Sequence, residues 1–436
     1  MRRDEPVAVE IHDLTNDGRG VAELDGQPIF VAGALPDERV WLKLRRRRRG
    51  QQEAELVSVI EPSESRVEPQ CRYFGRCGGC SLQHLAYEAQ LSFKQRAAAE
   101  ALRRIGGVEP EDWLDPVPSP QWNYRRRARL SARFVPGKQR TLVGFRERAA
   151  SYVTDMASCP VLEPPLDSAL GELAEVVTAS SIKDRLPQVE VALGDRSRAI
   201  VLRVLDPPTE SDIESFQAFG NRHGLDVYLQ PAGPGTVKPL GDAAGTLSYS
   251  LRDFDVELEF APTDFVQINA VVNARMVAEV VAAARPQTCD SVLDLYCGLG
   301  NFSLPLARHA GSVLGVEGDA GLVTRAARNA ERNGIENARF LTADLAKCDW
   351  SFMREPWDVV ILDPPRTGAE AVVAELGRVA PKRIVYVSCH PATLARDARV
   401  LVEKQHYRLR SARVFDMFPH THHVEVMTCF ERGTAS

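Results

Sequence analysis

The segment VLDLYCGLGNFSL, residues 292–304, constrains the fold of this chain more than any other. A short apolar run contains an aspartate, and two glycines, Gly298 and Gly300, then form a turn that leads into a predicted helix. Glycines allow a sharp turn and a close approach of the backbone, and the amides at a helix start can hold polar ligand atoms. The pattern is typical of the carboxyl end of the first strand in a doubly wound α/β domain.

More short apolar runs follow, and each ends in a residue with a reactive or polar side chain. They are SVLGVE, ARFLTAD, WDVVILD and RIVYVSC, which end in Glu317, Asp344, Asp363 and Cys389. Amphipathic helical stretches separate the runs, so we expect parallel strands whose carboxyl ends share one site. Residues 262–436 are therefore predicted to form a Rossmann-like domain. Its glycine loop differs from the G-x-G-x-x-G of dinucleotide binders and resembles that of class I methyltransferases, which bind S-adenosylmethionine (SAM).

Composition excludes several classes of protein. The chain of 436 residues has room for two or three domains, and it has no apolar run long enough to span a membrane. Its first residues, MRRDEPVAVEIHD, do not look like a signal peptide. Nine cysteines, an odd number without a secretion signal, favour a reducing cytoplasm over a disulfide framework. We therefore expect a cytoplasmic protein, and nothing in the sequence indicates an obligate protein partner.

The charge is distributed unevenly along the chain. Residues 1–160 hold 26 Lys and Arg against 22 Asp and Glu, whereas the remainder holds 28 against 37. The basic residues of the first part are bunched in two clusters, one at 45–49 and one that comprises Arg125, Arg126, Arg127, Arg129 and Arg133. Such clusters suit the phosphates of a nucleic acid, although a solvated charged face would have the same composition.

The first 62 residues alternate between apolar and polar positions in the manner of strands. The runs VAVEIHDL, GVAEL, QPIFVAG, ERVWLKL and EAELVSVI are separated by turn sequences, among them Asp25-Gly26. Short strands at this density predict a small barrel of the OB type. The stretch looks like a TRAM domain, an RNA-binding barrel found on several RNA-modifying enzymes. Residues 63–261 then form a predicted central α+β domain.

Cysteines suited to bind a metal centre lie directly after the barrel. In CRYFGRCGGCSLQH, Cys71, Cys77 and Cys80 are separated by five and two residues, and the tight Cys77–Cys80 hairpin presents two thiolates together. Cys159, which precedes a proline, is the best-placed fourth ligand. Zinc and an iron–sulfur cluster both accept four thiolates, and the spacing does not separate them. The other cysteines are predicted to be packing or incidental thiols, with the exception of Cys389.

Cys389 is predicted to face the methyl donor at the end of its strand. A thiolate there suits a pyrimidine acceptor, because its addition to C6 loads electron density onto C5, which then takes the methyl group; a base must afterwards remove the C5 proton. The motif Asp363-Pro-Pro-Arg366 favours this chemistry over amine methylation, in which an aromatic residue follows the prolines. It also lacks the second cysteine of RNA cytosine-C5 enzymes, which points to uracil.

These motifs together resemble the bacterial uracil-C5 RNA methyltransferases, in particular the type with a TRAM domain and a 4Fe–4S cluster that modifies 23S ribosomal RNA. The resemblance covers the whole chain and includes DFVQINAVVN, LDPPR, VSCHPATL and FPHTHHVEVMTCF. It implies that Cys71, Cys77, Cys80 and Cys159 hold the cluster, that Cys389 is the nucleophile and that Glu425 is the base. The SAM contacts that it implies are Gln267, Tyr296, Asn301, Glu317, Asp344 and Asp363.

Glu425 also fits a functional role by its position on the last strand, where it points opposite to Val424 and Val426, although half-exposed strand glutamates are common. The alternatives that remain are a tRNA substrate, a TRAM-containing radical-SAM enzyme and a catalytically silent RNA-binding factor. The tRNA enzymes of the family generally lack the barrel and the cysteines. Radical-SAM enzymes space their cysteines as C-x3-C-x2-C, which differs from the spacing here.

Overall fold

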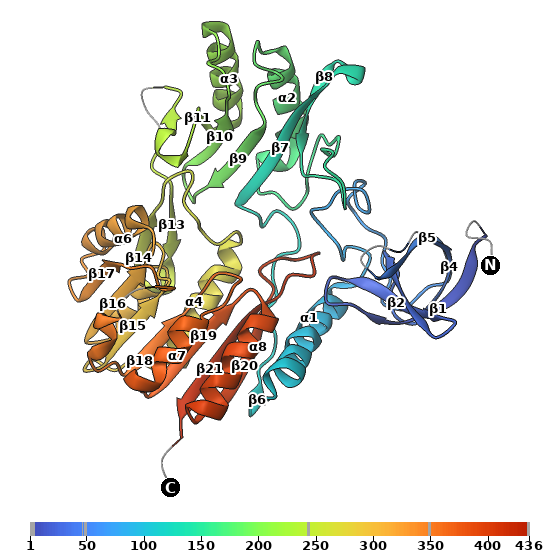
Figure 1. Ribbon diagram of the computed structural model, residues 1–436. Coiled ribbons are helices and arrows are strands. Elements are labelled where there is room, and N and C mark those ends of the chain that lie inside the picture. The colour runs from blue at the N-terminus through green and yellow to red at the C-terminus, as the bar shows by residue number, and fades with distance from the viewer. Residues whose placement is uncertain (1–4, 46, 48–49, 242–244, 348–349, 434–436) are drawn as a thin grey trace. The chain divides into compact units, whose positions relative to one another are not determined.

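The computed structural model describes residues 5–45, 47, 50–241, 245–347 and 350–433 (Figure 1). The chain separates into two compact units. The first comprises the described residues up to 94 together with 145–154 and 418–423, and the second comprises the rest. Within the described ranges, no helix combines the length and apolar character that crossing a bilayer requires.

The first unit contains a closed barrel of five strands, as the alternating sequence predicts. The residues that face its interior are apolar, and Val31, Val40 and Leu42 are fully buried. Asp25 and Gly26 have positive φ angles of 52° and 70°, which a two-residue hairpin turn requires. The strands are β1 (Val7–Leu14), β2 (Arg19–Leu24), β3 (Gln27–Ala32), β4 (Glu38–Leu44) and β5 (Gln52–Glu61), in the order β1-β2-β3-β5-β4.

An ion pair fixes the segment that follows the barrel. The carboxylate of Glu38 is buried, accepts the Leu35 amide at 2.8 Å and pairs with the guanidinium of Arg66. Arg66 Nη2 also donates to the Gly33 carbonyl at 2.8 Å. A buried carboxylate is stable only when it is paired and hydrogen-bonded, so Arg66 anchors the start of the cysteine-containing segment to the barrel.

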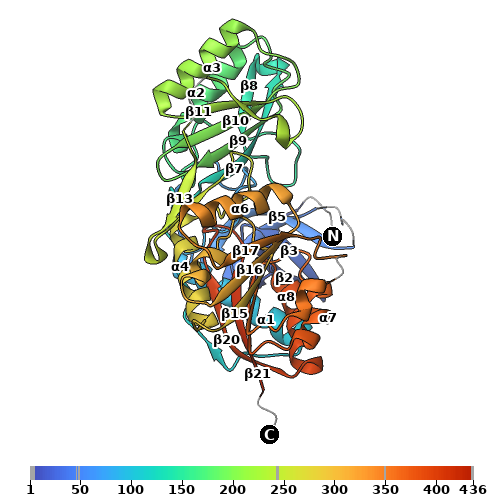
Figure 2. The ribbon, with the colours of Figure 1, turned by 90° about the vertical axis from the view of Figure 1, so that its left-hand side faces the viewer.

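A mixed sheet with two helices forms one part of the second unit. Its strands run in the order β12-β11-β10-β9-β7-β8. Helix α2 (Leu166–Ala179) packs on β8, and α3 (Glu210–His223) packs on β11 (Figure 2). The strands are β7 (Arg127–Val135), β8 (Arg140–Gly144), β9 (Gln188–Leu193), β10 (Arg198–Arg203), β11 (Asp226–Gln230) and β12 (Lys238–Pro239).

An eight-stranded sheet forms the Rossmann-like part of the second unit, in the order β17-β16-β15-β18-β19-β21-β20-β6. The strands are β15 (Ser291–Leu295), β16 (Ser312–Glu317), β17 (Ala338–Thr342), β18 (Val359–Leu362), β19 (Arg383–Ser388), β20 (Tyr407–Phe415), β21 (Glu425–Arg432) and β6 (Asp112–Trp113). Strands β15 to β19 are parallel, and β21 is antiparallel to both its neighbours. The five strands predicted in this domain are confirmed. The strand order reverses between β15 and β18, which is where such sheets bind ligands.

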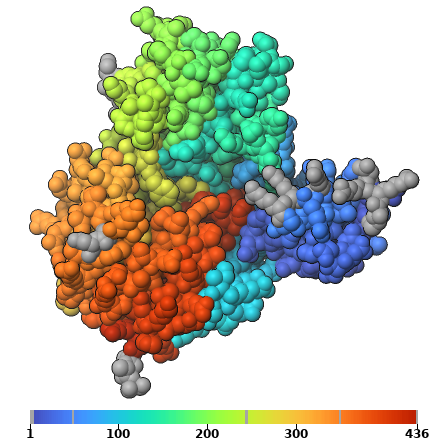
Figure 3. Space-filling model, in the orientation of Figure 1, coloured from blue at the N-terminus to red at the C-terminus, as the bar shows by residue number. Residues whose placement is uncertain are grey.

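Helices flank this sheet, and the residues of this part of the chain form the orange-to-red region of the surface in Figure 3. The helices are α4 (Ala270–Ala284), α5 (Ser303–Ala307), α6 (Ala320–Arg332), α7 (Glu370–Val379) and α8 (Pro391–Arg399). A short hairpin, β13 (Ser248–Leu251) and β14 (Val256–Glu259), precedes α4. Short 3-10 or π-helical turns are η1 (Leu102–Gly106), η2 (Pro136–Lys138), η3 (Pro234–Thr236), η4 (Arg252–Phe254), η5 (Ser351–Arg354) and η6 (Val400–Lys404).

The Rossmann-like part also includes residues that the sequence analysis assigns to the central domain, 63–261. Helix α1 (Tyr87–Ala101) continues into η1, which packs on α8, and Leu102 is buried in one core with Leu394. Strand β6 extends the sheet beside β20. At Gly106 a Cβ atom would lie 2.8 Å from the Ala395 carbonyl oxygen, so glycine permits this close approach. The division into domains 1–62, 63–261 and 262–436 stays a prediction.

Candidate functional site

The glycine loop after β15 adopts the sharp turn that its sequence predicts. Tyr296, Gly298 and Gly300 have positive φ angles of 66°, 55° and 91°. Directly before the loop, Asp294 is fully buried and accepts a hydrogen bond from the Ser303 hydroxyl at the start of α5. Burial raises the pKa of Asp294 to about 7, so this carboxyl is only partly ionised at neutral pH.

Glu317 is fixed across the glycine loop at the end of β16. One carboxylate oxygen accepts the Gly298 amide at 3.1 Å, and the other accepts the amides of Gly318 at 2.7 Å and Asp319 at 3.1 Å. A carboxylate oriented in this way at the tip of the second strand is suited to accept ribose hydroxyls. Glu317 thus ends β16, and its contact with SAM stays a prediction.

Asn301 is bound by other side chains of the protein. Its amide exchanges two hydrogen bonds with Asn273, both of 3.0 Å, and its oxygen accepts the Tyr249 hydroxyl at 2.9 Å. Gln267 lines a small pocket together with Tyr249 and Asn273. Helix α4 and hairpin β13–β14 thus fix the glycine loop from outside, and nothing in the spacing of the sequence indicated the contribution of Tyr249 or Asn273.

The remaining predicted SAM contacts differ in their surroundings. Tyr296 is half-buried against the core beneath β15. Asp344 is exposed, and its carboxylate accepts the amide of Ala346 at 2.9 Å. Asp363 follows β18 directly, and burial together with the neighbouring Asp294 raises its pKa.

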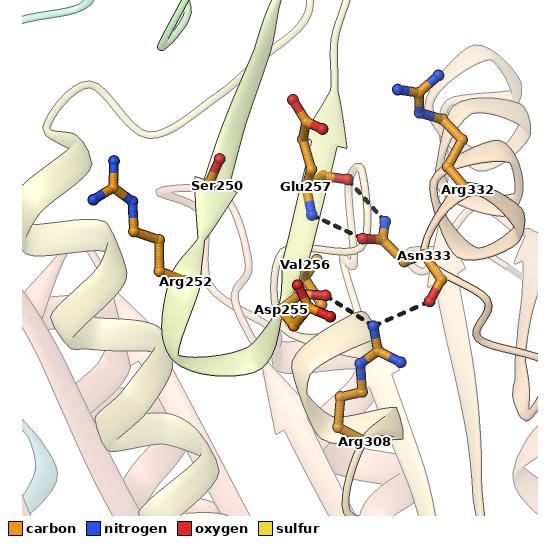
Figure 4. Close-up of a pocket in the computed structure, with 8 residues that line it drawn as sticks. All are labelled: Ser250, Arg252, Asp255, Val256, Glu257, Arg308, Arg332 and Asn333. Atoms are coloured by element: carbon orange, nitrogen blue, oxygen red, sulfur yellow. Dashed lines mark hydrogen bonds between the residues drawn. The ribbon is translucent and has the colours of Figure 1, made fainter.

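The hairpin that contacts Asn301 is itself fastened to α6. A polar pocket of about 450 Å³ lies at this junction, and Figure 4 shows Arg308 and Asn333 directed at the hairpin backbone. Arg308 donates to the carbonyls of Phe254, Asp255 and Asn333 at 3.2, 2.8 and 3.0 Å. The Asn333 amide bonds both the N–H and the carbonyl of Glu257, each at 2.8 Å. Both side chains therefore support the hairpin.

Cys389, Asp363 and Glu425 lie together at the ends of adjacent strands. Cys389 follows β19, and Glu425 begins β21, where Val426 pairs with Ser388. Glu425 is 3% exposed, and its pKa is raised well above the ordinary value by burial and by the charge of Asp363. The Arg366 guanidinium contacts the Cys389 thiol and opposes these effects. A thiol, two carboxyls and a guanidinium thus form one polar group at the strand ends.

The protonation of Cys389 leads to a prediction for the protein without RNA. The pKa of this thiol is raised to about 11, mainly by burial and also by Glu425 and Asp363, while Arg366 lowers it. Because only the thiolate reacts and its fraction rises about tenfold per pH unit below the pKa, alkylation of Cys389 by iodoacetamide should accelerate roughly tenfold per unit from pH 7 to 9. Peptide mass mapping measures this rate, and Arg366→Ala should lower it at each pH. A plateau below pH 9 would contradict the raised pKa.

Three of the four predicted metal ligands belong to the first unit. Burial raises the pKa of Cys77, whose sulfur accepts the Gly79 amide at 3.4 Å, and the nearby Cys71 raises it further. Cys80 is half-buried, and its carbonyl accepts a bond from Arg148. Cys159 lies in the second unit, where it is 5% exposed. Across the described residues, no three His, Cys, Asp or Glu side chains are grouped to bind a metal ion.

The second basic cluster is largely used by the fold. Arg126 pairs with Glu163 and Asp195, Arg129 pairs with Glu190, and Arg127 donates to the Val191 and Pro262 carbonyls. Its members are therefore mostly neutralised within the second unit. In the first cluster, Arg45 pairs with the exposed Glu55 and Arg47 donates to Gln27, whereas Arg46, Arg48 and Arg49 lie outside the described residues.

A groove of about 1250 Å³ lies between the barrel and the cysteine-containing segment of the first unit. Aromatic, basic and acidic side chains line its walls. They include Phe30, Phe74, Phe145, Arg19, Arg45, Arg66, Arg146, Arg148, Asp17, Glu53 and Glu55. Aromatic rings and arginines together can bind the bases and phosphates of single-stranded nucleic acid.

Comparisons with known proteins identify the family of this chain. The family model described as tRNA (Uracil-5-)-methyltransferase matches residues 245–432. The 23S rRNA (uracil(1939)-C(5))-methyltransferase RlmD of Nitrosococcus oceani is 49% identical over 432 residues, which cover 98% of this chain and 96% of the relative. The RlmD of Alkalilimnicola ehrlichii is 48% identical over 431 residues, or 98% of this chain and 97% of the relative.

A solved structure extends the similarity to the fold of almost the whole chain. It is the Pyrococcus abyssi tRNA (uracil-54, C5)-methyltransferase in complex with S-adenosyl-L-homocysteine, with a TM-score of 0.76 and 26% identity. The match covers 97% of this chain and 99% of that one. The chain therefore belongs to the SAM-dependent RNA uracil-C5 methyltransferases.

Proposed function

We propose that this enzyme methylates C5 of a uridine in 23S ribosomal RNA, with Cys389 as nucleophile and Glu425 as base. The proposal rests on one observation: Cys389, Glu425 and Asp363 lie close together at the ends of β19, β21 and β18. The relatives are named for uracil 1939 of 23S ribosomal RNA, and we propose the corresponding uridine as the target.

The proposed reaction starts after the Cys389 thiol has lost its proton to solvent, and it assigns the later proton and electron pairs to a residue or product. The Cys389 thiolate adds to C6 of the uracil, and the resulting enolate attacks the methyl group of SAM from C5, which releases S-adenosylhomocysteine. The Glu425 carboxylate then takes the C5 proton, and the electrons of that C–H bond restore the C5–C6 double bond as the thiolate leaves. Arg366 favours the thiolate, because its guanidinium lowers the pKa of Cys389.

The raised pKa of Glu425 suits a base. A carboxylate in a buried site binds a proton more tightly than one in water, so it accepts the C5 proton more readily once ionised. The proposed contacts of the methyl donor are the side chains of Gln267, Tyr296, Asn301, Glu317, Asp344 and Asp363. Among them, Glu317 has the geometry best suited to the ribose, because its two oxygens are oriented by three backbone amides.

Methylation of the proposed substrate tests this function directly. Purified protein with methyl-labelled SAM should transfer label to 23S ribosomal RNA from a strain that lacks the gene, and mass mapping should locate the label at C5 of one uridine. Transfer of no label to ribosomal RNA, with efficient labelling of tRNA instead, would favour the tRNA alternative.

We further propose that Cys71, Cys77, Cys80 and Cys159 hold a 4Fe–4S cluster. The spacing of the cysteines supports this, as does the cationic Arg148 beside Cys77 and Cys80, which would offset the charge of thiolates. When bound, such a cluster would cross-link the segments that carry its ligands, and no step of methyl transfer requires an electron from it.

Anaerobically purified protein is therefore expected to be brown, with a broad visible absorption shoulder and about four irons and four sulfides per chain. Iron and sulfide analysis provides the measurement, and Cys77→Ser should lose both elements. A colourless protein with one equivalent of zinc would show that the centre is a zinc site.

The barrel and the groove of the first unit are the proposed RNA surface, in keeping with a TRAM domain. Replacing residues 45–49 with neutral residues should weaken RNA binding and flatten its dependence on salt by about one unit of slope for each lost phosphate contact. Affinity for SAM should hardly change, because the replaced residues lie in the other unit from the glycine loop. An unchanged slope would identify this run as a solvated loop.

A further inference from the structure

The connection between β20 and β21 is held tightly by the segment that follows the cysteine hairpin. Within the first unit, the amides of Ser81 and Leu82 both donate to the His420 carbonyl at 2.9 Å. The Ser81 hydroxyl accepts the His422 amide at 3.0 Å and lies 3.2 Å from its ring Nδ1. The backbone of the connection is thus bonded at two successive points near its middle.

Two buried polar side chains of α1 bind the same connection. The Gln90 oxygen accepts the His420 amide at 2.9 Å, and its nitrogen donates to the Leu85 carbonyl at 2.8 Å. The Lys94 ammonium donates to the Phe418 carbonyl at 2.9 Å, and this lysine is fully buried. A buried amide or ammonium group destabilises the fold unless it is hydrogen-bonded. Polar side chains at these two buried positions therefore indicate a role for their hydrogen bonds to the connection, beyond filling space.

The clamped segment ends immediately before the proposed base. Residues 418–423 belong to the first unit, whereas Val424 and Glu425 belong to the second, where Glu425 pairs with Phe415 at the end of the β20–β21 ladder. Within the second unit the ladder holds Glu425 and the residues after it, and within the first unit the clamp holds residues 418–423, the chain that leads into Glu425. A base must lie within hydrogen-bond reach of the proton it removes, and small displacements strongly reduce its rate.

We propose that Ser81, Gln90 and Lys94 are positioning residues that place the Glu425 carboxylate for removal of the C5 proton. The proposal rests on the role of Glu425 proposed above. The clamp starts one residue after Cys80, so the position of the cysteine loop and that of the connection are linked. Loosening the clamp should slow the last step of the reaction and leave addition and methylation intact.

The test compares two RNAs with the full-length protein, SAM and the variants Gln90→Met and Lys94→Met. RNA with 5-fluorouridine at the target traps the methylated adduct without any need for a base, so the variants should trap it within about twofold of the wild-type rate. With ordinary RNA, the variants should accumulate a denaturant-stable covalent complex and release product about tenfold more slowly, as expected for a misplaced base. The wild-type enzyme should show no such accumulation.

A matched control is Gln405→Met, because Gln405 also donates its amide to a backbone carbonyl, that of Val373, within the second unit. It should behave as wild type in both assays. Ser81→Ala, at a half-buried position, repeats the test should either methionine variant fold poorly, and Ser81→Thr should restore release.

The outcomes separate this inference from the proposed function. Normal release by all three clamp variants, or an equal loss of trapping and release together with a lower unfolding temperature, would overturn the positioning role. Failure of the wild-type enzyme to trap 5-fluorouridine RNA would instead overturn the covalent mechanism itself.

Discussion

Replacing Cys389 with alanine is expected to abolish methyl transfer while binding of RNA and SAM persists. C5 of uracil is too poor in electrons to attack the methyl donor unless a nucleophile has first added to C6. In the proposed mechanism the Cys389 thiol is that nucleophile. The substitution removes one half-buried sulfur at the end of β19, so the sheet should remain intact. Filter binding and SAM affinity measure the retained functions, and methyl incorporation measures the lost one.

The same variant should form no covalent complex with RNA that carries 5-fluorouridine at the target. In the wild-type enzyme that complex should accumulate, because fluorine cannot leave C5 as a cation and elimination is blocked. Cys429→Ala is a suitable control, because this buried thiol lies on β21 of the same domain, away from the glycine loop. If Cys389→Ala retained methyl transfer near the wild-type rate, a different atom of the base would have to be the acceptor.

The strands and their ends could be predicted from the sequence because each strand is a short apolar run closed by a polar residue. Parallel strands present their carboxyl ends at one edge, so Asp363 and Cys389 were expected together without knowledge of any contact. The hairpin at Asp25-Gly26 was equally predictable, since only a few residue pairs tolerate its backbone angles.

Partners across strands could not be predicted, because they depend on register. Arg129 faces Glu190 on the neighbouring strand β9, so one member of a cluster that suggested phosphate binding is paired within the sheet. The buried positions of α1 likewise include Gln90 and Lys94, so an apolar pattern in the sequence does not identify the face on which this helix packs. The contact of Arg366 with Cys389 joins two loops that are adjacent only in the folded sheet.

Glu425→Gln should separate the two halves of the reaction. Glutamine has nearly the same shape as glutamate but cannot accept the C5 proton, so addition of Cys389 and methylation should proceed, and elimination should slow by about 10² to 10⁴-fold. Ordinary uridine RNA should then accumulate as a methylated covalent complex, which denaturing gels with labelled SAM detect. The wild-type enzyme under the same conditions should show only released product.

The raised pKa of Glu425 adds a pH test to this prediction. Only the ionised carboxylate can take a proton, and burial and Asp363 shift its pKa upward, so product release by the wild-type enzyme should accelerate as the pH rises through that pKa. Residual release by Glu425→Gln should lack this dependence, because the titrating group is gone. Glu431→Gln, on the same strand but paired with Arg383, should keep the wild-type profile. Rapid release by Glu425→Gln would assign proton removal to a different group, with Asp363 the nearest candidate.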